Sequence, residues 1–239
     1  MSLEGKVAVL TGGEGPLGRA VTKKFLAEGA KLVIGWYAPE EWEEAKGLIP
    51  GDYKGQLVDM RFDATKEEQV EKLMKKAKDD FGSIDILIHT VGLSPMHARA
   101  LIWEMDTASF DQMLEINLKT AFLCCKHAVK FMLEKGRGRI VVFTAKGAIE
   151  PGPRFGAYAV SKAGLMTLAL ALREELKDTN ITVNTAMLSV METFRTARAP
   201  SAEGEQRLNP QDVADFLSWL CADESELLSG STLRLFGKM

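Results

Sequence analysis

The sequence TGGEGPLG spans residues 11–18 and joins a short apolar run, Lys6–Leu10, to a segment with helical periodicity, Leu17–Glu28. It contains the pattern Gly13-x-Gly15-x-x-Gly18. Glycines permit a tight turn, let a pyrophosphate approach the backbone and allow a helix to pack closely on a strand. The N-terminus of the helix then offers free N–H groups and a partial positive charge to phosphates. Residues 11–18 therefore predict a strand, a phosphate-binding turn and a helix in succession.

Strand-like and helix-like segments alternate along the rest of the chain. Because crossovers long enough to hold a helix join parallel strands, this order predicts a doubly wound, Rossmann-like α/β fold: a parallel sheet of about seven strands with helices on both faces. No linker or repeat divides the chain, so one domain is expected over residues 1–239. The expected strands are Lys6–Leu10, Lys31–Gly35, Gln56–Met60, Ile84–His89, Arg139–Thr144, Ile181–Ala186 and Ser231–Phe236, and the expected helices are Leu17–Glu28, Lys66–Asp80, Phe110–Glu134, Ala157–Lys177 and Pro210–Ala222.

Composition and charge exclude several classes of protein. The chain has 239 residues, of which 46% are hydrophobic, and this excludes a disordered chain. Its 30 Lys and Arg nearly balance 33 Asp and Glu, which leaves no electrostatic footprint for nucleic acid or a membrane surface. No apolar run reaches the roughly 18 residues of a spanning helix and no signal peptide is recognisable, so a cytoplasmic location is expected. The three histidines and three cysteines lack metal-ligand spacing, so no metal is expected.

The end of the second expected strand carries no charged residue. Dinucleotide sites usually have an acidic residue there for the ribose hydroxyls, or a basic residue for a 2′-phosphate. Here the chain reads Val-Ile-Gly-Trp-Tyr-Ala over residues 33–38. The choice between NAD and NADP therefore stays open, and Trp36 or Tyr37 is a candidate to lie against the adenosine.

Tyr158 and Lys162 are four positions apart at the start of a long expected helix. This spacing places the two side chains on one face of the helix. A tyrosine has an ordinary pKa of about 10, and a nearby cation lowers that pKa because it favours the phenolate. Tyr158 is therefore a candidate to exchange a proton near neutral pH, as carbonyl reduction or alcohol oxidation requires.

Taken together, the order and spacing of these pieces resemble the short-chain dehydrogenase/reductase family over nearly the whole chain. The resemblance implies an NAD(P)-dependent oxidoreductase acting on a small carbonyl or alcohol substrate. It also implies a homodimer or homotetramer built on the helices expected at Phe110–Glu134 and Ala157–Lys177. The pieces that carry it are residues 11–18, Asp63-Ala64, Ile84-Asp85-Ile86-Leu87-Ile88, Asn117, Gly138-Arg139-Ile140, Tyr158 with Lys162, Val183-Asn184, and Pro210-Gln211-Asp212 with Gly230.

Family roles carry over to matching positions. Tyr158 would be the general acid/base, Lys162 would bind the nicotinamide ribose and acidify Tyr158, and Asn117 would anchor a proton-relay water. Thr193 would approach the nicotinamide carboxamide. The remaining cofactor contacts would come from Gly12, Gly13, Gly15, Leu17, Gly18, Trp36, Asp63, Ala64 and Gly92.

The sequence departs from the family at the catalytic serine, thirteen residues before the tyrosine, where it has Ala145. Losing one donor from an oxyanion-type site typically costs about 10² to 10³ in rate. Thr144 should point to the opposite face of the strand, so it replaces the hydroxyl only if the backbone has left the pleat, and Lys146 or Ser189 is the alternative donor. Further departures are Pro16 in the glycine loop and His89-Thr90-Val91-Gly92 in place of Asn-Asn-Ala-Gly.

Three functional interpretations remain open. The first is the NAD(P)-dependent oxidoreductase just described. The second is an enzyme like quinonoid dihydropteridine reductase, which the chain resembles in its Gly-Gly-x-Gly-x-Leu-Gly loop and the pair Ala145-Lys146, and whose electron-poor substrate needs less polarisation. The third is a nucleotide-binding oligomeric protein without catalytic activity.

Overall fold

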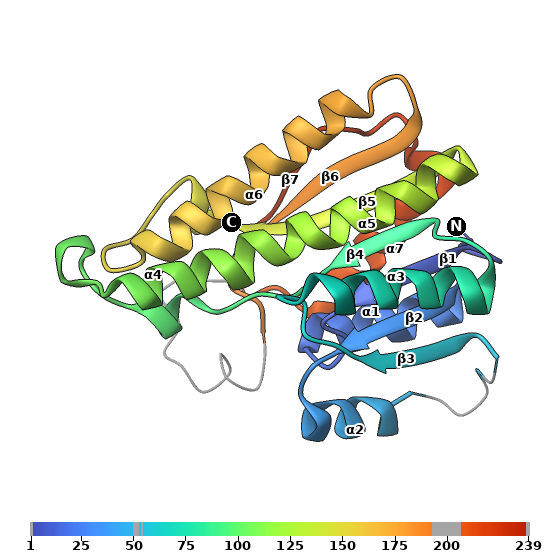
Figure 1. Ribbon diagram of the computed structural model, residues 1–239, viewed down its shortest axis with the longest axis horizontal. Helices are drawn as coiled ribbons and strands as arrows, with labels where there is room; N and C mark the ends of the chain where they lie inside the picture. The colour runs from blue at the N-terminus through green and yellow to red at the C-terminus, as the bar shows by residue number, and fades with distance from the viewer. Residues whose placement is uncertain (1, 50–52, 54, 193–206, 238–239) are drawn as a thin grey trace.

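The computed structural model describes residues 2–49, 53, 55–192 and 207–237. It contains a seven-stranded, all-parallel sheet in the order β3-β2-β1-β4-β5-β6-β7 (Figure 1). The predicted doubly wound sheet is confirmed. The strands are β1 (Val7–Thr11), β2 (Lys31–Trp36), β3 (Leu57–Arg61), β4 (Ile86–His89), β5 (Arg137–Ala145), β6 (Asn180–Leu188) and β7 (Thr232–Leu235).

Helices cover both faces of this sheet. One apolar cluster packs α1 (Pro16–Ala27), α2 (Pro39–Gly47) and α7 (Pro210–Cys221) against it, and a second packs α3 (Glu67–Phe81), α5 (Thr120–Lys135) and α6 (Gly156–Glu175) on the other side (Figure 1). The two-sided cover explains why β1 and β4 are buried at every position and read as continuous apolar runs. Among the described helices, none combines the length and apolar character needed to cross a membrane.

Two helical features differ from the sequence-based expectation. The single helix expected at Phe110–Glu134 is instead α4 (Thr107–Leu114), a π-helical turn (Glu115–Lys119) and α5. The helix α2 was not expected, because its sequence PEEWEEAKG buries only Trp42 and Ala45 and so shows little periodicity. Short π-helical turns occur often at functional sites, and this one contains Asn117.

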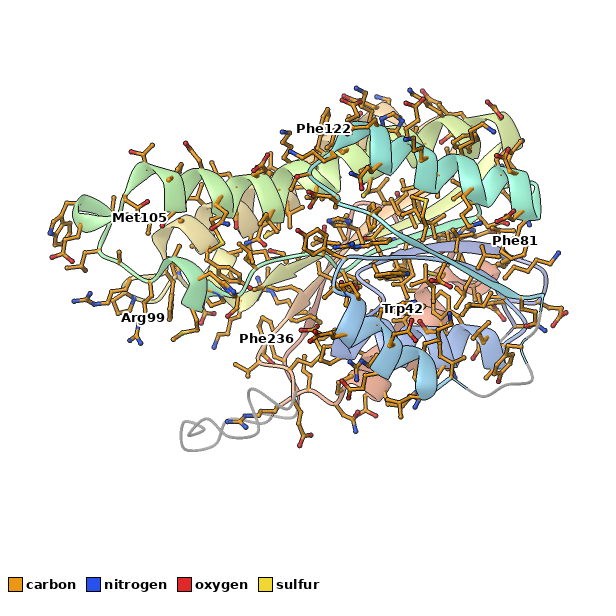
Figure 2. All side chains as sticks on the ribbon, turned by 60° about the horizontal axis from the view of Figure 1, so that its bottom comes forward. Trp42, Phe81, Arg99, Met105, Phe122 and Phe236 are labelled. Atoms are coloured by element: carbon orange, nitrogen blue, oxygen red, sulfur yellow. The ribbon has the colours of Figure 1, made fainter. Side chains whose placement is uncertain are left out.

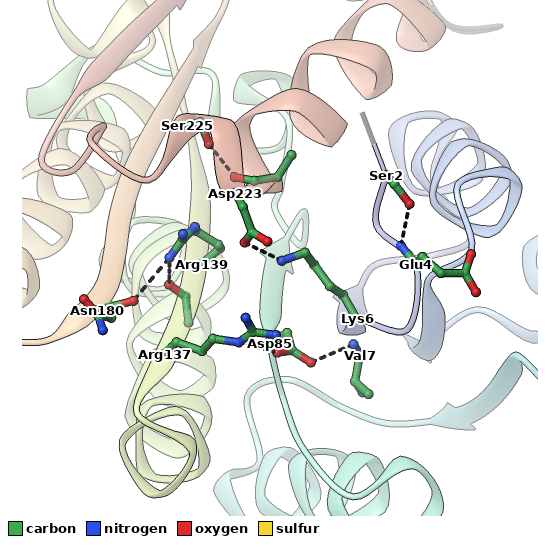
Figure 3. Close-up of polar contacts among 12 residues, drawn as sticks. Ser2, Glu4, Lys6, Val7, Asp85, Arg137, Arg139, Asn180, Asp223 and Ser225 are labelled. Carbon is green, nitrogen blue, oxygen red and sulfur yellow. Dashed lines mark hydrogen bonds and ion pairs between the residues drawn. The ribbon is translucent and has the colours of Figure 1, made fainter.

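Buried polar contacts hold the amino-terminal end of the sheet (Figure 3). Asp85 lies just before β4, and its carboxylate accepts a hydrogen bond from the Val7 N–H at 2.9 Å. The same carboxylate forms an ion pair with Lys135 at 2.6 Å. Lys6 pairs with Asp223 at 2.6 Å. These contacts lie at the ends where β1 and β4 begin, so the opposite, carboxyl ends of the strands are left for a binding site.

Candidate active site

A cleft of about 900 Å³ opens at the carboxyl ends of the strands, where the strand order reverses between β1 and β4. Open α/β sheets bind ligands at such a switch point. The cleft brings together nine of the site residues expected from sequence: Gly12, Gly15, Leu17, Gly18, Asp63, Ala64, Gly92, Tyr158 and Lys162.

The glycine loop forms the floor of the cleft between β1 and α1. Gly12 has a φ of 80°, a backbone conformation that favours glycine, and its carbonyl accepts a 3.2 Å hydrogen bond from the Gly15 N–H. A side chain at Gly18 would clash with the Gly12 carbonyl, so the first turn of α1 packs directly on the loop. Pro16 occupies the first helical position and leaves the helix intact. Leu17 and Gly18 of the first turn of α1 line the cleft, and the N–H groups of a first turn have no partner within the helix, so this end of α1 suits the pyrophosphate of a dinucleotide.

Asp63 and Ala64 follow β3, the edge strand of the sheet, and line the cleft there. One carboxylate oxygen of Asp63 accepts hydrogen bonds from the N–H and the hydroxyl of Thr65, at 2.9 and 2.7 Å. The Asp63 N–H donates to Gln69 at 2.8 Å. These bonds fix the turn between β3 and α3, so a fixed polar edge is available for a base such as adenine.

Three expected cofactor contacts are not among the residues that line the cleft. Trp36 stacks on Trp42, with ring centroids 6.0 Å apart, and its indole N–H donates to Asp59 at 2.8 Å. Its ring is therefore turned away, and Tyr37 is the aromatic of this strand end that lines the cleft. Gly13 packs against Ile34 behind the loop. Thr193 lies outside the described residues.

Tyr158 and Lys162 stand on one face of α6, as their spacing predicts. The Lys162 ammonium lies 5.9 Å from the centroid of the Tyr158 ring and donates a 3.1 Å hydrogen bond to the Phe143 carbonyl. Burial lowers the pKa of Lys162 to about 8. Burial also raises the pKa of Tyr158 to about 12, opposite to the direction expected from the nearby ammonium. Desolvation therefore outweighs the ammonium, and the phenol keeps its proton at neutral pH.

Asn117 supports this pair from behind rather than from within the cleft. Its side-chain oxygen accepts a 2.6 Å hydrogen bond from the Leu93 N–H, and its amide donates to the Ser161 hydroxyl at 3.0 Å. Ser161 in turn donates to the Tyr158 carbonyl at 2.7 Å. A side chain at Gly92 would approach both Asn117 and the Lys162 ammonium. The fully buried Asn117 thus fixes the loop after β4 relative to the first turn of α6.

Ala145 lines the cleft at the end of β5, where the family has its serine. The neighbouring Thr144 donates its hydroxyl hydrogen bond to the Lys162 carbonyl at 2.7 Å, on the other face of the strand. Lys146 pairs with Glu150 at 3.1 Å and is not among the cleft residues. Ser189 does line the cleft, and its buried hydroxyl has no hydrogen-bond partner within the described part of the chain. Thr144 and Ser189 both line the cleft, but the Thr144 hydroxyl is bonded to the Lys162 carbonyl, so Ser189 is the candidate whose hydroxyl is available to a ligand.

Sequence reasoning gave no role to His89, the last residue of β4. Its ring is fully buried between the Thr11 hydroxyl, 2.9 Å from Nδ1, and the Thr120 hydroxyl, 3.1 Å from Nε2. The Thr120 hydroxyl donates its hydrogen bond to the Ile116 carbonyl and therefore accepts one from the His89 ring. Nε2 must then be the protonated nitrogen of His89, and Nδ1 is the acceptor. Burial, with a smaller contribution from Lys162, lowers the pKa of His89 to about 3. A neutral imidazole therefore ties β1, β4 and α5 together beneath the cleft.

Comparison with known proteins identifies the family. A family model described as short chain dehydrogenase matches residues 6–204. The chain belongs to the short-chain dehydrogenase family. This confirms the resemblance seen in the sequence and places the chain among the oxidoreductases.

Several relatives match this short-chain dehydrogenase over almost its whole length. It is 29% identical to 3-oxoacyl-[acyl-carrier-protein] reductase FabG of Thermotoga maritima, covering 99% of the chain and 98% of the relative. It is also 29% identical to a short-chain type dehydrogenase/reductase of Picea abies, covering 98% and 92%. The solved structure of a short-chain type dehydrogenase/reductase from Mycobacterium ulcerans superposes with a TM-score of 0.90, at 22% identity, over 98% of the chain and 90% of that structure. This last likeness concerns the fold.

Proposed function

We propose that this enzyme transfers a hydride between NAD(H) or NADP(H) and a small carbonyl or alcohol substrate, with Tyr158 as the general acid/base. The observation that carries the proposal is that Tyr158 and Lys162 share one cleft with the glycine loop, Asp63 and Ala64. A dinucleotide bound with its pyrophosphate at α1 would reach from Asp63 to the strand ends beside Tyr158. The cofactor, when bound, supplies or accepts the hydride.

The side chains of the cleft provide the proton chemistry. In carbonyl reduction, Tyr158 donates its phenolic proton to the substrate oxygen, and in alcohol oxidation it takes that proton back. The Lys162 ammonium stabilises the phenolate that remains after donation. Asn117, through Ser161, holds the backbone of Tyr158 in place. The Ser189 hydroxyl supplies a second hydrogen bond to the substrate oxygen, in place of the serine that Ala145 replaces.

The substrate is best sought among carbonyl compounds first. The named relative from Thermotoga maritima is a 3-oxoacyl reductase, so a 3-oxoacyl thioester is a suitable starting substrate. The presence of Ala145 favours a second candidate, an electron-poor acceptor such as a quinonoid dihydropterin, which needs less polarisation than a ketone. A third outcome is nucleotide binding without turnover.

One assay series distinguishes these candidates. Binding of NADH and NADPH is measured by fluorescence, and oxidation of each is then followed with 3-oxoacyl thioesters, simple ketones and quinonoid dihydropterin. Turnover with an oxo substrate supports the leading proposal, and turnover with the pterin alone supports the second. If NADH or NADPH binds but no acceptor is reduced, both the carbonyl and the dihydropterin candidates are contradicted.

We also propose that the enzyme works as a homodimer or homotetramer. A second, open hollow of about 1260 Å³, which shares only Gln112 and Glu115 with the lining of the cleft, runs between α4, α5 and α6. Phe122, labelled in Figure 2, lies in it with 46% of its surface exposed. Leu118, Leu168 and Ala171 line the same hollow. An apolar face of this kind on two long helices suits an isologous contact with a second copy.

A further inference from the structure

Glu14 belongs to the glycine loop, but its side chain reaches the end of β2. Its Oε1 atom accepts hydrogen bonds from the backbone N–H groups of Tyr37, at 2.9 Å, and Ala38, at 3.4 Å. The sequence of this strand end, Trp36-Tyr37-Ala38, carries no charged side chain of its own. The fold therefore brings a carboxylate from the loop after β1 to a position that β2 leaves without one.

The other carboxylate oxygen of Glu14 lacks a partner. Oε2 is buried and makes no hydrogen bond within the described part of the chain. Glu14 lines the cleft together with Tyr37 and Asp63. A buried acceptor without a hydrogen bond costs free energy. A carboxylate accepts and never donates, so the group that completes Glu14 must be a donor such as a hydroxyl.

The loop that carries Glu14 is held in place from outside the cleft. Arg19 on α1 donates a 2.8 Å hydrogen bond to the Glu14 carbonyl and forms a 3.0 Å ion pair with Glu44 on α2. Arg19 thus contacts the backbone of residue 14, and its charge is directed to Glu44. The carboxylate of Glu14 is fixed at two points, its own backbone and the N–H groups after β2.

We propose that Glu14 selects NAD(H) over NADP(H) by accepting hydrogen bonds from the adenosine ribose hydroxyls. This inference rests on the proposed function, because it requires a dinucleotide in this cleft. An acidic residue near the end of β2 performs this task in dinucleotide-binding folds, whereas a 2′-phosphate is accommodated by a basic residue. Here the acidic group comes from the loop between β1 and α1.

The same contacts oppose a 2′-phosphate. The carboxylate would repel its negative charge, and it already occupies the two backbone N–H groups that a phosphate at this place would use. Arg61, the last residue of β3, donates to the Tyr37 carbonyl at 3.2 Å and lies over the Tyr37 ring at 5.9 Å, but it is not among the residues that line the cleft. Near the end of β2, the described residues that line the cleft include the acidic residues Glu14 and Glu41 and no Lys or Arg.

The test is a fluorescence titration of the full chain with NADH and with NADPH. The variant Glu14→Gln keeps the size of the side chain and an acceptor for the Tyr37 N–H, but removes the charge. Glu40→Gln removes an equal charge from the first turn of α2, outside the cleft, and is the matched control. Thermal melting of each variant establishes that it is folded.

We expect the unaltered protein to bind NADH about 10- to 100-fold more tightly than NADPH, the range that a hydrogen bond to a charged group provides. Glu14→Gln should narrow this ratio at least about 10-fold, and Glu40→Gln should leave it unchanged. Equal binding of the two nucleotides, a preference for NADPH, or an unchanged ratio in Glu14→Gln would overturn the role of Glu14 and leave the proposed function standing. If neither NADH nor NADPH binds, both the role of Glu14 and the proposed function are overturned.

Discussion

The Thr144 hydroxyl donates a 2.7 Å hydrogen bond to the carbonyl of Lys162, and so ties β5 to α6 behind the cleft. The same bond removes Thr144 as a replacement for the family's serine. Phe143, Thr144 and Ala145 of this strand end all line the cleft, and Ala145 contributes only a methyl group where the family has its serine. Ala145 is paired in register with Leu188, the last residue of β6, and Ser189 directly follows that strand.

Ser189→Ala should lower kcat for a carbonyl substrate by about 10-fold or more, because it removes the one hydroxyl donor left at this position. Ala145→Ser in the Ser189→Ala background should restore much of that loss, since it returns a hydroxyl to the neighbouring strand end. Steady-state kinetics of the three proteins measures both effects. If Ser189→Ala leaves kcat intact on every substrate that the enzyme reduces, Ser189 has no part in polarising the substrate.

The pH dependence of the two reaction directions should differ. Because burial raises the pKa of Tyr158 to about 12, the phenol is protonated and ready to donate at neutral pH. Below pH 7, where Lys162, with its pKa of about 8, keeps its ammonium, carbonyl reduction should therefore vary little, whereas alcohol oxidation, which needs the phenolate, should rise with pH. Initial rates in both directions check this. An oxidation rate that falls as pH increases from 6 to 7 would contradict it.

His89 should make the fold more stable at neutral than at mildly acidic pH. Its pKa is about 3 in the folded chain and near 6.5 when unfolded, so the unfolded state binds the extra proton between these values. Stability is fully present above pH 6.5 and is lost as pH falls through this window. Between pH 6.5 and 5, the free energy of unfolding should drop by about 2 kcal/mol from this group.

The variant His89→Asn isolates the contribution of the imidazole. It removes the titrating group while leaving a side chain that can bond to Thr11 and Thr120. Denaturant unfolding at several pH values should show a smaller loss on acidification than in the unaltered chain. Parallel curves for the two proteins would show that His89 is not the group responsible.

Phe122→Arg should weaken the proposed contact between copies of the chain. The substitution places a charge in the apolar hollow over α4, α5 and α6 without touching the cleft. We expect the unaltered protein to be a dimer or tetramer by size-exclusion chromatography with light scattering, and the variant to shift toward smaller species. A monomeric unaltered protein would rule out this use of the surface.

The fold could be predicted because its signals are local. Each strand of a sheet covered on both faces is a continuous apolar run, and the glycine loop marks where the first strand gives way to a helix. The helix α2 was missed because only two of its residues are buried, so its sequence shows charge rather than periodicity. The division of the Phe110–Glu134 helix was missed because a π-helical turn changes its hydrogen bonding without changing its apolar pattern.

Sequence motifs correctly predicted those residues of the candidate site whose positions a motif specifies. The sequence did not predict contacts between residues that are far apart in the chain. The alternation of strand side chains made Thr144 a replacement only if the backbone leaves the pleat, and in the structure its hydroxyl is bonded to the Lys162 carbonyl. The same argument could not decide whether Trp36 or Tyr37 faces the cleft, because the sequence does not show where β2 ends. Glu14 was overlooked since its partners, the N–H groups of Tyr37 and Ala38, lie 23 and 24 residues away in the chain.

Tyr158→Phe provides the most direct test of the central claim, since it removes the phenolic oxygen that exchanges the proton and leaves the ring in place. The measurement is kcat for a reducible substrate together with the Kd of the cofactor. The account predicts that kcat falls by about 10² or more while the Kd changes little. Unchanged turnover in Tyr158→Phe would contradict the assignment of Tyr158 as the general acid/base.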